Sequence, residues 1–156
     1  MKKLVSIIAV VALVAIVATL LVACVPTDPA KAEANLKEAG YTAKKTDSDD
    51  LFGLSGLAMP DGATSAVTGS KDSEMIFIYY FEDSASAKTF YENSEILNFI
   101  KDMIEESKEE VKAQYEAEKI SKDEYDEAME ILNSFKIKKF GKVVYAGTKA
   151  AIKAAS

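Results

Sequence analysis

The chain has 156 residues and a formal net charge of -6, and it contains no histidine, no tryptophan and a single cysteine. All 19 basic residues are lysine, so the chain also lacks arginine. These absences exclude a Ser/His/Asp triad, histidine-ligated zinc, an intrachain disulfide and bidentate binding of phosphate by arginine. The length fits one domain, and the acidic balance predicts no nucleic-acid partner because that binding rests on basic side chains.

The N-terminal segment points to a membrane. Met1-Lys2-Lys3 is followed by residues 4–23, which are almost wholly apolar and would span about 30 Å of bilayer as a helix. Such a segment is typical of an uncleaved transmembrane anchor, an ordinary secretory signal or a bacterial lipoprotein signal. In each case the lysines stay inside, and the rest of the chain faces the outside of the plasma membrane.

The residues Leu21-Val22-Ala23-Cys24 distinguish these interpretations. They resemble the lipobox of bacterial prolipoprotein signal peptides. The resemblance implies that Cys24 receives a diacylglycerol thioether, that residues 1–23 are removed by cleavage between Ala23 and Cys24, and that Cys24 becomes the N-terminus. Two acyl chains anchor a protein stably where one chain is marginal. The apolar run exceeds the ~7–15 residues usual in a signal peptide, which leaves the uncleaved helix open as the alternative.

The remainder of the chain is strongly acidic. Residues 24–156 carry 17 lysines against 25 acidic residues, a net charge of -8, and this balance weighs against a surface that lies on anionic lipid. Two prolines within residues 24–30 stop any continuation of the leader helix. We therefore expect a short tether over residues 24–30 and a single domain over residues 31–156.

Hydrophobic periodicity and turn residues predict the elements of this domain. In chain order we expect a helix over 30–39, a strand over 41–45, a loop over 46–62 that folds back on the domain, a hairpin of strands 63–70 and 74–81, a helix from residue 87 capped by Ser84 or Ser86, a helical hairpin over 95–134, a hairpin of strands 135–139 and 142–146, and a helix over 149–155. Strand 74–81 is apolar on both faces, which predicts a central strand covered on both sides.

These elements predict an α+β fold, with an antiparallel sheet of about four or five strands, helices on one face and a helical hairpin insertion. The turn of the helical hairpin lies near residues 119–121. There, Ser121 and Glu124 have the spacing of a capping box, in which each side chain satisfies a backbone amide of the other residue.

The polar clusters do not have the spacing of known sites. Asp47-Ser48-Asp49-Asp50 fails the calcium-loop pattern, because the fifth and sixth positions are Leu51 and Phe52. The four glutamates within residues 105–110 alternate with lysines as on a solvated helix face, and Gly53-Leu54-Ser55-Gly56 lacks the lysine of a phosphate loop. We therefore expect no catalytic residue, no metal ligand and no cofactor, and we expect most tyrosines to belong to the core.

Two further stretches carry a second resemblance. Residues 143–153 and residues 35–41 resemble small uncharacterised lipoproteins of low-GC Gram-positive bacteria. That resemblance implies a location and a similar fold, and it implies no activity.

The sequence therefore predicts a membrane-anchored lipoprotein that acts as a non-catalytic binding or accessory module outside the plasma membrane. Its expected partners are membrane lipid through acylated Cys24, together with an envelope protein or a small ligand. One alternative is an envelope hydrolase that uses Asp/Glu or Ser/Lys chemistry. Another is a protein held by an uncleaved N-terminal helix whose helical hairpin docks to a membrane partner.

Overall fold

The computed structural model describes residues 25–47 and 59–156. The expected signal peptide, its cleavage site at Ala23 and Cys24, and the greater part of the 46–62 loop, with the glycine stretch 53–56, lie outside the described residues. The elements of the described part are α2 (Pro29–Glu38), β1 (Thr42–Asp47), β2 (Ala63–Lys71), β3 (Glu74–Phe81), α3 (Ser84–Asn93), α4 (Glu95–Glu116), α5 (Lys122–Ser134), β4 (Lys136–Phe140), β5 (Val143–Gly147) and α6 (Lys149–Ala155).

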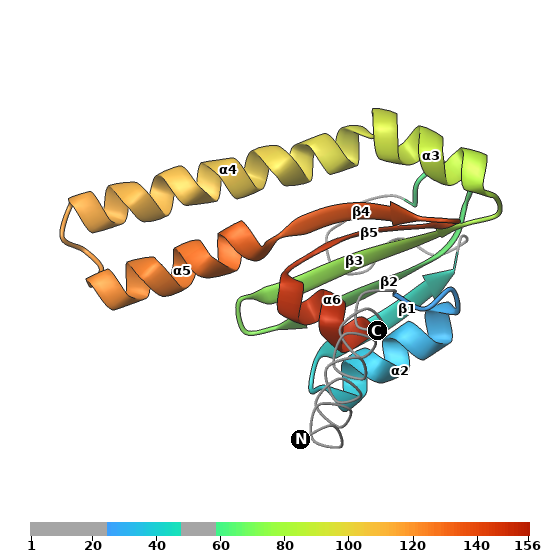
Figure 1. The fold of residues 1–156 in the computed structure, drawn as a ribbon, viewed down its shortest axis with the longest axis horizontal. Coiled ribbons are helices and arrows are strands. Elements are labelled where there is room, and N and C mark those ends of the chain that lie inside the picture. The colour runs from blue at the N-terminus through green and yellow to red at the C-terminus, as the bar shows by residue number, and fades with distance from the viewer. Residues whose placement is uncertain (1–24, 48–58) are drawn as a thin grey trace, which may run out of the picture.

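The strands form one antiparallel sheet in the order β1-β2-β3-β5-β4 (Figure 1). The expected α+β class and strand number are thereby confirmed. β3 lies at the centre, as its sequence predicts, because its alternate side chains enter two different cores. Ile76 and Ile78 point into one core, and Tyr79 and Phe81 point into the other.

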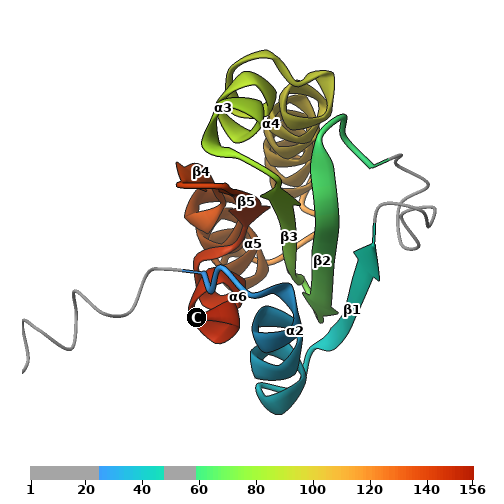
Figure 2. The same ribbon diagram turned by 90° about the vertical axis from the view of Figure 1, so that its right-hand side faces the viewer.

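Helices cover both faces of the sheet, whereas we expected them on one face only. α2 and α6 pack side by side on the first face, while α3 and the first turns of α4 cover the second face (Figure 2). The physical reason lies in β3 and β5, whose side chains are apolar in both directions and would expose one apolar face if a single helical layer were present.

Two boundaries differ from the expectation. β1 continues through Thr46 and Asp47, which we expected in a loop, because pairing with Ala66 and Ser65 in β2 outweighs the weak strand preference of Asp47. α3 begins three residues early, and its N-cap is Asp83, whose carboxylate accepts hydrogen bonds from two backbone amides, where we expected a serine cap. The remaining elements lie within about two residues of their expected positions.

Two glycines are required by the backbone, Gly147 by close packing and Gly40 by its positive φ. At Gly147, a Cβ atom would lie 2.7 Å from the carbonyl oxygen of Met75 and 2.9 Å from the Cβ of Ile76, so β5 passes β3 too closely for any side chain. Gly40 ends α2 with φ +84°, and the two amides that follow the cap return to the carbonyls of Lys37 and Leu36 in a Schellman motif.

Candidate functional site

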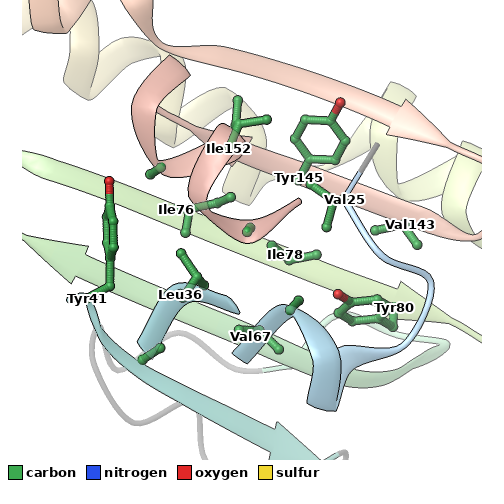
Figure 3. Close-up of a cluster of buried hydrophobic side chains, with 14 residues drawn as sticks. Val25, Leu36, Tyr41, Val67, Ile76, Ile78, Tyr80, Val143, Tyr145 and Ile152 are labelled. Atoms are coloured by element: carbon green, nitrogen blue, oxygen red, sulfur yellow. The ribbon is translucent and has the colours of Figure 1, made fainter. Parts of the chain in front are cut away.

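The described chain begins inside the first core. Val25 is 3% exposed, and it packs with Val143 and Tyr145 of β5 in the cluster beneath α2 and α6 (Figure 3). Only one peptide unit, about 3.8 Å between Cα atoms, separates it from Cys24. Within residues 24–30, which we expected as a tether, Val25 therefore packs against the domain, and Pro29 and Ala30 lie in the first turn of α2.

Asp28 fixes the end of this segment by capping α2. Its carboxylate accepts a hydrogen bond of 2.9 Å from the amide of Ala30, and Pro29 occupies the first helical position, where the absence of an amide has no cost. Tyr80 lies nearby on β3, and its hydroxyl is buried without a hydrogen-bond partner among the described residues. Burial, and secondarily the charge of Asp28, raise the pKa of Tyr80 above its usual range, so this end of the domain keeps a neutral phenol.

The carboxylates of a cleft beside α3 do not resemble an acid–base pair. The cleft lies between α3, the start of α4 and residues 60–62, has a volume of about 680 Å³, and is lined by Asp61, Asp83 and Glu95 among others. Asp83 is committed to capping α3, and the backbone amide of Ser86, which donates to its carboxylate, lowers the pKa of Asp83. A general acid at neutral pH needs a raised pKa, so Asp83 is poorly suited to that role.

A serine and a lysine meet on the opposite side of α3. The Nζ atom of Lys139 donates to Ser84 Oγ at 3.2 Å, and Ser84 Oγ in turn donates to the carbonyl of Gly141. Both bonds are solvent-exposed, whereas lysine becomes a base when it is buried. This contact therefore ties α3 to the β4–β5 turn and does not have the environment of a Ser–Lys dyad.

The acidic groups singled out in the sequence stay apart in the structure. Asp47, the one described residue of the 47–50 cluster, pairs with Lys45 at 2.8 Å. Glu105 pairs with Lys108 at 2.7 Å on the exposed face of α4. Among the described residues, no three His, Cys, Asp or Glu side chains are grouped so as to hold a metal ion. The three tyrosines of the sheet, Tyr79, Tyr80 and Tyr145, are core residues, while Tyr91 of α3 is exposed.

The helical hairpin of α4 and α5 projects from the end of the sheet (Figure 1). Only Leu97 and Ile100, both near its base, are fully buried, and α5 has no fully buried residue. Beyond the base, the seam consists of half-buried side chains, namely Met103, Ile104, Val111, Tyr125, Ala128, Met129, Ile131 and Leu132. Ile96 and Ile100 of α4 pack in the second core, and the seam of the hairpin continues from them with Met103 and Ile104.

The tip of the hairpin is built from local interactions. The rings of Tyr115 and Tyr125 stack with centroids 4.7 Å apart, and the expected capping box of Ser121 and Glu124 is present. α4 ends in a second Schellman motif, in which Glu118 takes the left-handed conformation at φ +54°. These contacts close the tip of a projecting hairpin whose seam is only half-buried. No sequence signal other than the length of the helices indicated that it would leave the sheet.

Comparison with protein-family models, with curated proteins and with solved structures finds no match to this chain. Among residues 25–47 and 59–156, none of the helices has both the length and the apolar character needed to cross a bilayer.

Proposed function

We propose that this chain is a lipid-anchored protein that faces outward from the plasma membrane and works as a non-catalytic binding or accessory module. The observation that carries the proposal is the lipobox-like sequence Leu21-Val22-Ala23-Cys24 placed directly before a buried Val25. A thioether at Cys24 would hold the domain directly at the bilayer, with no free tether between them.

The projecting hairpin supports the binding role. Apolar side chains that stay half-exposed along a projecting hairpin are typical of a surface that meets a partner, because a bound protein would bury them further. Phe99, on the outer side of α4, is 59% exposed, which adds an aromatic side chain of the kind that anchors interfaces. The partner of this hairpin would be an envelope protein.

The anchor is tested by metabolic labelling with a clickable fatty acid in a bacterium that makes lipoproteins. The wild-type chain is expected to carry the label and to migrate as a shortened species, and Cys24→Ser is expected to lose both properties. A matched control, Ser6→Ala within the apolar leader, should leave labelling unchanged. An unlabelled wild-type chain of full length would contradict the lipid anchor and support the uncleaved helix.

The binding role is tested by cross-linking in intact cells. A photoreactive residue in place of Val111, on the half-buried seam of the hairpin, should yield a discrete cross-linked species. The same group in place of Ala34, on the surface of α2, should not. Equal cross-linking at both positions, or none at Val111, would contradict a partner on the hairpin.

A further inference from the structure

The edge strand β4 carries an exposed stripe of two lysines and an aromatic ring. Lys136, Lys138 and Phe140 alternate with inward residues, so they project from one face of the sheet. Both lysines are exposed, neither forms an ion pair among the described residues, and Phe140 is 55% exposed. The stripe is positively charged and partly apolar, in contrast to the net charge of -8 over residues 24–156.

The stripe lies on the same face as the start of the described chain. Phe140 pairs with Val143, and Lys138 pairs with Tyr145, so each of these pairs shares one face of the β4–β5 ladder. Val143 and Tyr145 belong to the cluster that buries Val25 (Figure 3). Figure 2 shows the chain entering beside β5 and α6, on the side of the molecule where β4 forms the edge. The stripe on β4 therefore lies next to β5, the strand against which Val25 packs, at the usual strand spacing of about 4.8 Å.

This juxtaposition decides which surface an anchor would turn toward the bilayer. α2 and α6 cover the same face over β1, β2 and β3, but β4 lies outside that cover. A lipid on Cys24 would bring β4 within reach of the headgroups, where lysines are attracted to anionic lipid and an aromatic side chain fits the interface.

We propose that Lys136, Lys138 and Phe140 form a membrane-contact surface that takes anionic phospholipid headgroups and orients the anchored domain. This inference rests on the proposed lipid anchor. It also changes the expectation drawn from net charge, because the acidic groups and this basic stripe occupy different surfaces. With β4 against the bilayer, the face of α4 that carries Phe99, on the opposite side of the sheet, stays in water.

The absence of tryptophan makes a direct test possible. Phe140→Trp places a single fluorophore on the stripe of the full chain, and Phe99→Trp places one at an exposed control position on α4. Each chain is purified from bacterial membranes and reconstituted into vesicles of phosphatidylglycerol and phosphatidylcholine whose acyl chains are brominated. We expect a blue-shifted emission that the bromines quench for Phe140→Trp, and a solvent-like, unquenched emission for Phe99→Trp.

Charge is tested in the Phe140→Trp background. The pair Lys136→Glu and Lys138→Glu should remove the blue shift and the quenching, and vesicles of phosphatidylcholine alone should have the same effect. The matched pair Lys101→Glu and Lys119→Glu on the hairpin makes the same change in net charge and should leave both signals intact.

Co-sedimentation with the vesicles separates the two proposals. If the Phe140→Trp chain sediments with vesicles while its emission equals that of the Phe99→Trp control, the contact surface is overturned while membrane attachment of the chain stands. A signal that survives the charge reversal overturns the role of the lysines and hence the proposal. A chain that does not sediment overturns both the anchor and the inference that rests on it.

Discussion

The most informative perturbation is Val25→Ala, because it asks whether the chain beside Cys24 belongs to the domain. Val25 is 3% exposed and packs against Val143 and Tyr145. Removing its two methyl groups should lower the free energy of unfolding by about 1.6 kcal/mol through lost hydrophobic burial. The cavity left behind raises this loss to roughly 2 kcal/mol. For a domain of this size the melting temperature should fall by roughly 7 °C.

The assay is thermal unfolding of the full chain in mild detergent, followed by circular dichroism. Thr27→Ala is the matched control, because Thr27 is exposed two residues further along and its substitution should change stability by less than about 0.5 kcal/mol. An unchanged melting temperature for Val25→Ala would refute the reasoning, since residues 24–30 would then act as a free tether.

Three further predictions concern the stability of the same domain. Gly147→Ala should destabilise the domain by about 1–3 kcal/mol, because its Cβ would overlap the carbonyl of Met75, and a wild-type melting curve would contradict that overlap. Gly40 and Glu118 both have positive φ, which glycine adopts more easily than other residues. Gly40→Ala should therefore destabilise the domain by about 1 kcal/mol, and Glu118→Gly should stabilise it by about 0.5–1 kcal/mol. Effects of the opposite sign would refute the cap assignments. Burial raises the pKa of Tyr79 to about 12, so the folded state keeps a proton that the unfolded chain loses near pH 10. Stability should therefore be full below pH 10 and fall as the pH rises toward 12, as urea titrations at several pH values would show, and a flat profile would contradict it.

Much of the fold follows from local sequence. The two-sided apolar pattern of Glu74–Phe81 predicted a central strand, and the capping box at Ser121 predicted where α5 begins. Both features are local, since alternation and side-chain caps act within a few residues. The placement of helices on both faces was not predicted, because it depends on which elements meet across the sheet.

The features closest to the proposed function were the hardest to predict. A single valine between Cys24 and Pro26 has no periodicity, so its burial depends on contacts with β5, more than a hundred residues away. The exposed stripe on β4 was also hidden, because Lys136, Lys138 and Phe140 acquire a common direction only when β4 pairs with β5. The negative net charge sums this basic surface with the acidic helices, so it argued against contact with anionic lipid.

The central claim is that Cys24 carries the lipid that holds this domain at the membrane. Intact-mass spectrometry of the wild-type chain extracted from bacterial membranes tests it most directly. We predict a chain that begins at Cys24 and is heavier than its amino-acid sequence by a diacylglycerol group. A chain that begins at Met1, or one that begins at Cys24 without added lipid, would contradict it.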